Sequence, residues 1–367
     1  MMTNRTPKAI QKIEKIKIIY PIIFGVGVVF IMLAKNFNAD IFTVIQFTWY
    51  SLFWIIVALS LMAIRDIGYM LRIKILTDNE FTWKQAFRVI MLWEFTSAIT
   101  PSAIGGTSVA ILYVNKEGIS IGKSSAVVMA TSFLDEFYFL LMFPILLIIS
   151  GDNLFNVGSS GKEIVGISFT NEFFYFAVVG YAVKFVYVCF LVYGLFFNPR
   201  GLKWLLLWIF KLPILRKWKQ GANEAGSEII VSSKELKRKP FIFWLKAFMA
   251  TFFSWTARYW VVNALFMAFF KVSNHFLIFG RQLVTWIMML VSPTPGGSGF
   301  SEYVFIKYFG DFMPTTHALA QPTATVMAFF WRLISYYPYL IIGAILVPKW
   351  IKQKFGSMQN QADKKLV

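Results

Sequence analysis

Long apolar stretches separated by short basic stretches make up most of the chain. Residues 41–64 include no charged side chain, and about 20 apolar residues are enough for a helix to cross a bilayer core of roughly 30 Å. The pattern therefore indicates an all-α integral membrane protein. Stretches of this kind predict six transmembrane spans, at residues 18–34, 41–64, 124–149, 173–197, 241–270 and 321–347.

Two further apolar stretches are too short to cross the membrane, and proline and glycine interrupt each of them. The first has arms at residues 86–100 and 107–115, and the second has arms at residues 276–291 and 300–309. A helix of 15 residues covers only about 22 Å, so each pair of arms predicts a re-entrant helical hairpin. The interrupting residues are Pro101, Gly105, Gly106, Pro293, Pro295, Gly296, Gly297 and Gly299.

Basic residues are concentrated in three segments, as expected where the cytoplasmic parts of a membrane protein carry positive charge. These segments are the N-terminus (1–17), a linker (198–240) and the tail (348–367). Placing all three in the cytoplasm lets the six spans alternate consistently. The first hairpin then enters from the cytoplasm and the second from outside. The prediction is a multi-pass protein of the bacterial cytoplasmic (inner) membrane with both termini in the cytoplasm.

The order span, hairpin, span occurs twice within a single transmembrane domain at residues 18–347. The first copy covers about residues 41–149 and the second about residues 241–347, and the two cross the membrane in opposite directions. Interrupted helices at matching positions of an inverted repeat are typical of the midplane binding site of a transporter. The repeat therefore predicts a site between the two hairpin turns.

Helix ends inside a bilayer leave backbone groups unpaired, and such groups persist only where protein or a water-filled cavity satisfies them. Half-helices that begin at about Thr107 and Phe300 would direct their positive N-terminal ends toward such a cavity, which favours an anionic ligand. The alternative is that the hairpins are packing devices whose glycines allow close helix approach.

Composition narrows the chemistry of this site. The net charge of +18 comes from basic segments beside the spans in a chain that is 57% hydrophobic, so no nucleic-acid binding is expected. One cysteine and two distant histidines cannot supply a disulfide framework or a multi-ligand metal site. The glycine pairs lack the lysine of a phosphate-binding loop. We expect no metal, no cofactor and no enzymatic activity.

Charged residues inside the predicted spans are candidate ligands, because charge is costly in the membrane interior. Asp135, Arg258 and Arg332 lie within spans, and Glu302 lies on a hairpin arm. We predict that Asp135 or Glu302 pairs with one of the two arginines when the cavity is empty. A lipid phosphate would compete for that arginine, whose planar fork binds phosphate in a bidentate manner. The alternative is a static structural ion pair.

Three motifs carry a family resemblance. They are PTPGGSGFSE at residues 293–302, WRLISY at residues 331–336 and SAITPSAIGG at residues 97–106. The chain resembles the transmembrane region shared by lysylphosphatidylglycerol synthases and by stand-alone flippase-like membrane proteins. The resemblance implies translocation of an anionic phospholipid or a polyprenyl-phosphate-linked lipid. It does not imply aminoacyl transfer, because that activity belongs to a separate soluble domain.

The leading hypothesis is therefore a flippase-like transporter whose partners are membrane lipids with anionic headgroups, together with an unidentified membrane or synthase partner. Two alternatives stay open at this point. One is a carrier for a small anionic or polar solute, and the other is an intramembrane transferase. The adjacent carboxyls of Asp135 and Glu136 point about 100° apart on a helix, so they suit acid–base catalysis poorly.

Overall fold

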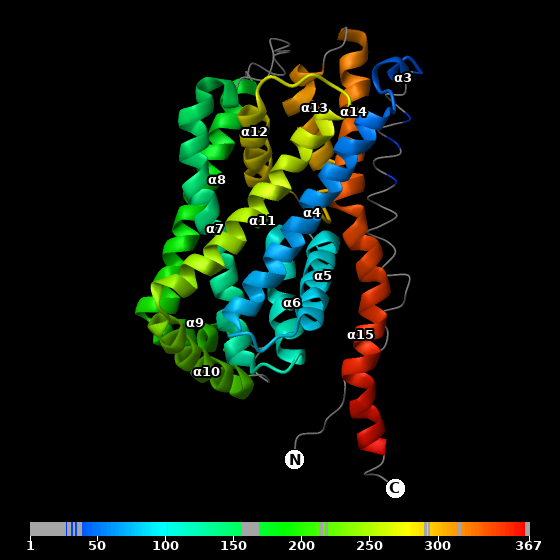
Figure 1. The fold of residues 1–367 in the computed structure, drawn as a ribbon. Helices are drawn as coiled ribbons and strands as arrows, with labels where there is room; N and C mark the ends of the chain where they lie inside the picture. Colours follow the sequence, from blue (N-terminus) through cyan, green and yellow to red (C-terminus); the bar gives the residue numbers. More distant parts are fainter. Residues whose placement is uncertain are drawn as a thin grey trace.

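A computed structural model describes residues 39–100, 102–155, 169–212, 219–289, 294–313 and 317–363, with a few isolated positions between them. All regular elements in these ranges are helices (Figure 1). The span predicted at residues 18–34 lies almost entirely outside the described residues, as do Pro101 and Pro293.

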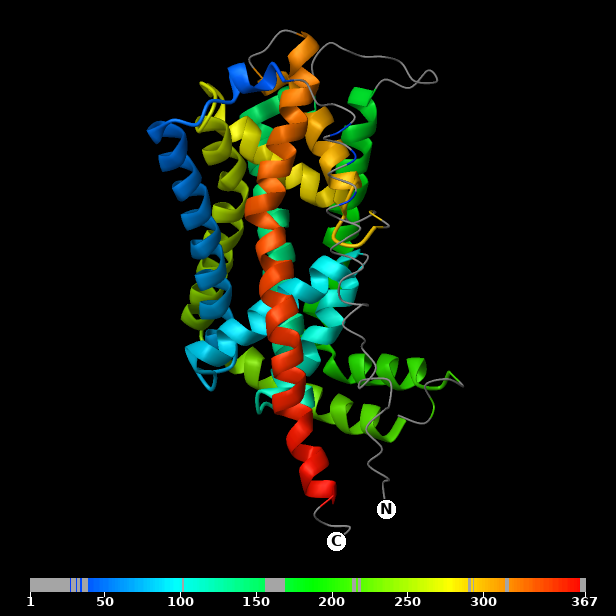
Figure 2. The same cartoon turned by 90° about the vertical axis from the view of Figure 1, so that its right-hand side faces the viewer.

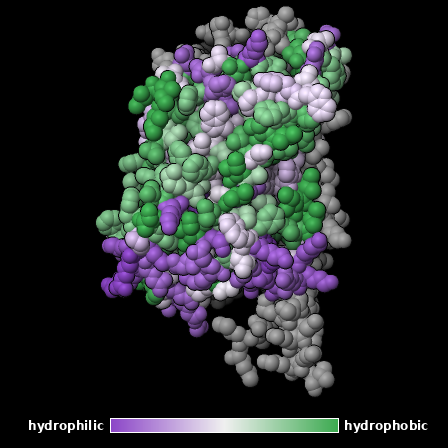
Figure 3. Space-filling view, in the orientation of Figure 1, coloured by the Kyte–Doolittle hydropathy of each residue, from purple (hydrophilic) through white to green (hydrophobic). Residues whose placement is uncertain are grey.

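The long helices run roughly side by side along the height of the molecule. They are α4 (Trp49–Leu76), α7 (Ile121–Ser150), α8 (Phe169–Val192), α11 (Phe241–Met267), α14 (His317–Ser335) and α15 (Tyr337–Asp363). Four segments in the described ranges are long and apolar enough to cross a membrane: Trp49–Leu76, Ile121–Ser150, Ala177–Phe197 and Leu319–Lys354. A hydrophobic band covers the middle of the molecule above a hydrophilic lower rim (Figure 3). The chain is a multi-pass membrane protein.

Two helix–turn–helix pairs lie among the long helices. The first pair is α5 (Trp83–Ile99) and α6 (Ser102–Lys116), and the second is α12 (His275–Met288) and α13 (Phe300–Phe309). Figures 1 and 2 show the first pair in the lower half and the second pair in the upper half, so their turns approach each other from opposite ends. The remaining elements are short or transverse: α3 (Ile41–Val44), η1 (Gly151–Leu154), the π-helix η2 (Tyr193–Phe197), α9 (Pro199–Ile209), α10 (Lys219–Arg238) and η5 (Gly310–Phe312).

The centre of the fold is the contact between α4 and α11, which run antiparallel along much of their length (Figure 1). Close approach depends on Gly68 of α4, because a Cβ there would lie 2.2 Å from Ser254 Oγ and 2.9 Å from Ala250 O. Small residues at helix contacts are common in membrane proteins, where packing replaces the hydrophobic effect as the driving force.

The predicted span at residues 41–64 is wrong at both ends. The long helix begins at Trp49, where Thr48 Oγ1 accepts a hydrogen bond from Ser51 N at 3.2 Å, and it continues to Leu76. Arg65 and Arg72, which follow the predicted span, therefore lie inside the helix. The predicted span ends before Arg65 because that residue is charged. In the folded protein, however, both arginine side chains are buried against carboxylates from other helices.

The predicted turn of the first hairpin is also wrong in its extent. Helix α6 begins at Ser102, so Gly105 and Gly106 lie within the helix and the arm does not begin at Thr107. Gly106 serves packing, because a Cβ there would lie 2.0 Å from Ser97 Oγ on α5. In the second hairpin the arm at residues 300–309 agrees with α13, and the other arm ends at Met288 rather than at residue 291.

The predicted last span and the basic segments also differ from the structure. A helix break at Tyr336 divides the span at residues 321–347 into α14 and α15. Helix α15 then continues to Asp363 through the predicted tail, and the linker at residues 198–240 folds into α9 and α10. Charged residues do not prevent helix formation once a segment leaves the apolar layer, so the apolar pattern underestimates helix length.

Replacing Gly68 with alanine tests the central contact. We expect Gly68→Ala to lower the free energy of unfolding by about 1–3 kcal/mol, since an overpacked contact forces the helices apart. A Cβ at Gly221 on α10 meets no heavy atom within 4 Å, so Gly221→Ala is the matched control. Thermal unfolding of both variants in detergent measures the difference. Equal melting temperatures for the two variants would contradict this packing.

Candidate functional site

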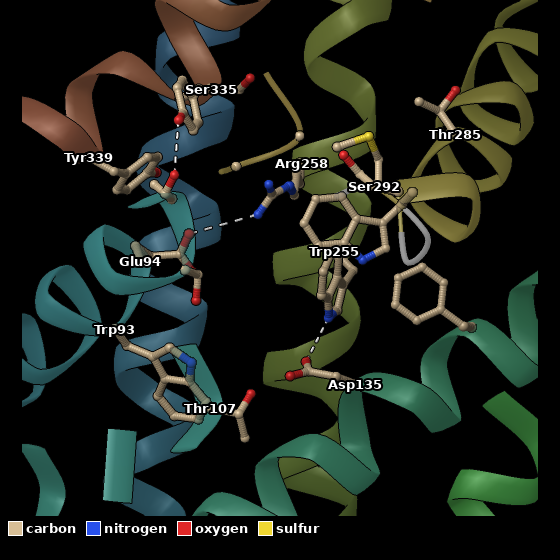
Figure 4. Close-up of a pocket in the computed structure, with 18 of the residues that line it drawn as sticks. Trp93, Glu94, Thr107, Asp135, Trp255, Arg258, Thr285, Ser292, Ser335 and Tyr339 are labelled. Carbon is tan, nitrogen blue, oxygen red and sulfur yellow. Dashed lines mark hydrogen bonds and ion pairs between the residues drawn. The ribbon is translucent and has the colours of Figure 1, made fainter. Parts of the chain in front are cut away.

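A cavity of about 620 Å³ lies between the two hairpin turns and the long helices (Figure 4). Aromatic side chains form much of its wall, among them Trp93, Trp255, Trp286 and Trp331. Its charged lining residues are Arg72, Glu94, Asp135, Glu136, Lys184, Arg258 and Arg332. The cavity therefore combines apolar walls with several convergent charged groups, which is the usual composition of a ligand pocket.

The two hairpin turns meet at the edge of this cavity. Gly296 N donates a backbone hydrogen bond to Thr100 O at 3.4 Å, and Tyr336 Oη donates to Ala98 O at 3.0 Å. Gly296 has a φ of 55°, and a Cβ there would lie 2.6 Å from Ala98 O. Glycine is therefore required here by both the left-handed backbone and the close approach of the other hairpin.

Arg332 and Glu302 form an ion pair, which is one of the four pairings that the sequence left open. Arg332 Nε lies 2.7 Å from Glu302 Oε1, and Arg332 Nη2 donates to Gly296 O at 3.0 Å and also to Ser301 Oγ. Glu302 Oε2 in turn accepts a hydrogen bond from Gly299 N at 2.6 Å, at the start of α13. Both side chains are buried. This network holds the second turn, which is the role of a structural ion pair.

Asp135 lines the cavity but pairs with Arg72, which lies beyond the end of the span predicted at residues 41–64. Arg72 Nη2 donates to Asp135 Oδ2 at 3.3 Å, and Trp255 Nε1 donates to Asp135 Oδ1 at 2.6 Å. Arg65 and Arg72 are seven residues apart, a spacing that places both on one face of a helix. That spacing is the signal in the sequence that could have identified Arg72.

Glu94 belongs to a second charged cluster beside the cavity. Its Oε1 lies 2.5 Å from Nη2 of Arg65, a side chain with no exposed surface. Arg65 also pairs with Asp66 at 2.7 Å, and Asp66 accepts a hydrogen bond from Tyr339 Oη at 3.0 Å. Arg65 therefore attracts the Glu94 carboxylate more strongly than the cations of the cavity do.

Arg258 is the cavity cation with the longest ion-pair distance among the residues that the structure describes. Its Nη1 lies 4.0 Å from Glu94 Oε2, and its guanidinium group stacks over Trp286 with 4.4 Å between the guanidinium carbon and the ring centroid. Its side chain is 17% exposed, and Figure 4 shows it directed into the space between the hairpins. This guanidinium group is the one best placed to receive an anion.

Two further polar groups line the cavity near Arg258. Within the described part of the chain, Gln282 Nε2 and Tyr259 Oη are buried without a hydrogen-bond partner. A buried polar atom without a partner is costly. Both atoms have almost no accessible surface, so a ligand in the cavity would reach them only after neighbouring side chains shift.

Helix α8 contributes to the wall of the cavity. Val183 and Tyr187 line it, and they are also 58% and 40% exposed. Between them Lys184 is only 3% exposed, and its Nζ lies 2.6 Å from Glu136 Oε2. Residues that belong to both the cavity wall and the exposed surface indicate a sideways opening here, with a charged pair beside it.

The predicted site residues that the structure describes divide into three groups. Asp135, Arg258, Gly296, Gly297 and Arg332 line the cavity. Glu302 and Gly299 lie behind the lining in the network around Arg332, and Pro295 lies in the same turn. Gly105 and Gly106 lie in α6, and Pro101 and Pro293 are outside the described residues.

Comparison with known proteins assigns the family. The family described as the lysylphosphatidylglycerol synthase TM region matches residues 18–343. The chain belongs to this family. It is also 26% identical over 308 residues to a protein named UPF0104 membrane protein from the archaeon Archaeoglobus fulgidus, a match that covers 80% of this chain and 85% of the relative. No solved structure shows a significant match.

Removing Arg332 tests its structural role in this family member. We expect Arg332→Ala to lose about 3–5 kcal/mol of stability, because Glu302 is then buried without its partner. The double variant Glu302→Gln/Arg332→Met removes both charges and should recover most of that loss. Yield of monodisperse protein and thermal unfolding measure the effect. A fully stable Arg332→Ala protein would contradict the structural role.

Proposed function

We propose that this protein moves an anionic lipid between membrane leaflets and performs no covalent chemistry. The observation that carries the proposal is Arg258, a weakly paired guanidinium group in a cavity that opens sideways to the apolar surface. A phosphate group would replace the distant Glu94 carboxylate as the partner of Arg258 and could bind it in a bidentate manner. The ligand is a phospholipid or a polyprenyl-phosphate-linked lipid.

The sideways opening favours a lipid over a small soluble anion. A lipid headgroup can enter past Val183 and Tyr187 while its acyl chains stay in the bilayer, so the apolar tail never crosses the polar cavity. A soluble solute needs no such opening. Lys184 and Glu136, which flank this route, would meet the headgroup before it reaches Arg258.

The proposed topology is six spans and two re-entrant hairpins arranged as an inverted repeat, in a bacterial cytoplasmic membrane with both termini in the cytoplasm. The order of long helix, hairpin and long helix in α4–α7 and again in α11–α15 supports it. Transporters with such repeats alternate access by rocking one repeat against the other. The hydrogen bond of Gly296 joins the two turns, and that of Tyr336 joins the end of α5 to the break between α14 and α15; both would break and re-form in that motion.

Lipid transfer in vesicles tests the proposal. Purified protein in liposomes should move a fluorescent anionic phospholipid between leaflets, and Arg258→Ala should slow this transfer by about 10- to 150-fold, the loss of one charged hydrogen bond. Arg258→Lys should retain part of the activity. Lys246→Ala is the matched control, because Lys246 is an exposed cation on the same helix.

The same vesicles distinguish the competing transport function. Uptake of radiolabelled inorganic phosphate or glycerol phosphate without any lipid transfer would favour a small-solute carrier. Absence of transfer for every phospholipid and lipid phosphate tested would reject the flippase proposal. Loss of folded protein in Arg258→Ala would instead assign Arg258 to the structure, and gel filtration of each variant detects this outcome.

A further inference from the structure

Helices α9 and α10 form a transverse layer at the lower end of the molecule, across the direction of the long helices (Figures 1 and 2). Lys203 Nζ on α9 lies 2.8 Å from Ser227 Oγ on α10. Helix α10 is attached to α7, because Gly122 N donates to Glu228 Oε2 at 2.7 Å. The layer is therefore a fixed part of the fold with a defined outer face.

The outer face of α9 is apolar. Trp204 and Trp208 are 65% and 56% exposed, and Leu212 just beyond the helix is 56% exposed. Their spacing of four residues places them on one stripe. None of the residues of α9, all of which the structure describes, is buried. This stripe is a large apolar surface that no other described element covers.

The exposed positions of α10 offer a contrast within the same layer. Gln220, Asn223, Glu224 and Ser227 are all exposed and polar. Val231, at 56% exposed, is the one large hydrophobic residue that α10 exposes, whereas α9 exposes two tryptophans. Exposure to water explains the polar face of α10 but leaves the tryptophans of α9 unexplained.

Exposed aromatic residues also stand just before α9. Tyr193 and Phe197, in η2 after α8, are 58% and 73% exposed, and α9 begins two residues later at Pro199. Tryptophan and tyrosine side chains prefer the headgroup level of a membrane, where their rings are buried and their polar atoms are hydrated. Helix α9 lies at the lower end of the long helices, where the hydrophobic band gives way to the hydrophilic rim (Figures 1 and 3).

Charge on α9 indicates which lipids it contacts. Residues 199–212 include Arg200, Lys203 and Lys211 and no acidic residue. Arg200 precedes Trp204 by four residues, and both Arg200 and Lys211 are exposed. Basic residues beside an interfacial apolar face attract anionic lipids.

We propose that α9 is an interfacial helix that inserts Trp204 and Trp208 into the headgroup layer of the adjacent leaflet and binds anionic phospholipid there. This lipid contact is separate from the cavity and does not depend on transport. The interfacial helix collects anionic lipid at the foot of α8, the helix that carries the sideways opening of the cavity.

A single fluorescent label tests the depth of α9. The exposed Cys189 is first replaced by serine, and Trp208→Cys in the full-length protein is labelled with an environment-sensitive dye in phosphatidylcholine vesicles. Leu212→Cys is a second reporter on the same stripe, and Gln220→Cys on α10 is the matched control. We expect brominated lipid to quench the label at both stripe positions and aqueous iodide to quench it only at position 220.

A second arm tests the preference for anionic lipid. Brominated phosphatidylglycerol should quench the label at position 208 more strongly than brominated phosphatidylcholine at equal content. Arg200→Ala and Lys211→Ala should each reduce that preference by about fivefold, the contribution of one basic residue near a charged membrane surface. The depth of the label should stay unchanged in both variants.

Three outcomes would overturn the proposal. Iodide quenching at position 208 equal to that at position 220 would place α9 in water. Protection of position 208 from both lipid and iodide would indicate a protein partner or a second copy of the chain. Equal quenching by the two brominated lipids would remove the anionic preference. None of these outcomes bears on lipid transfer through the cavity.

Discussion

A charged side chain inside a layer of apolar helices has to find an opposite charge or a polar backbone group, because lipid offers neither. This constraint determines how the helices of this protein assemble. Arg65 of α4 pairs with Glu94 of α5, Arg72 of α4 pairs with Asp135 of α7, and Arg332 of α14 pairs with Glu302 of α13. Each pair joins two elements, so the pairs select one arrangement among the many that apolar packing alone would allow.

The same constraint explains the two interrupted hairpins. Each turn ends a helix inside the apolar layer and leaves backbone groups that need partners. Gly296 N donates to Thr100 O across the interface between the turns, and Tyr336 Oη, at the break between α14 and α15, donates to Ala98 O. Arg332 completes the set by donating to Gly296 O. The turns are therefore held by a few polar contacts rather than by extensive apolar burial, and the cavity lies beside them.

Arg258 departs from the pattern of close pairing. Its carboxylate neighbour, Glu94, lies closer to Arg65, and the guanidinium group stacks over a tryptophan ring instead. An arginine kept in place by ring stacking and a distant carboxylate retains hydrogen-bond donors for a ligand. Arg332, with its network of contacts inside the protein, therefore maintains the site. Arg258, with donors left for a ligand, is the group that would bind an anion. The interfacial helix α9 adds a contact with lipid outside the site.

The sequence by itself determined that the chain is a helical membrane protein with two short, broken hairpins. The length of an apolar stretch decides this, because it shows whether the helix can cross the bilayer. It also identified Arg332 and Glu302 as candidates for an ion pair, but it left open which carboxylate pairs with which arginine. Only the tertiary structure decided where α4 ends, that Arg72 is the partner of Asp135, and that Gly106 belongs to a helix contact rather than to a turn. An arginine in a loop and an arginine paired within the membrane look alike along the chain. The difference lies in a carboxylate that folding brings from a distant segment.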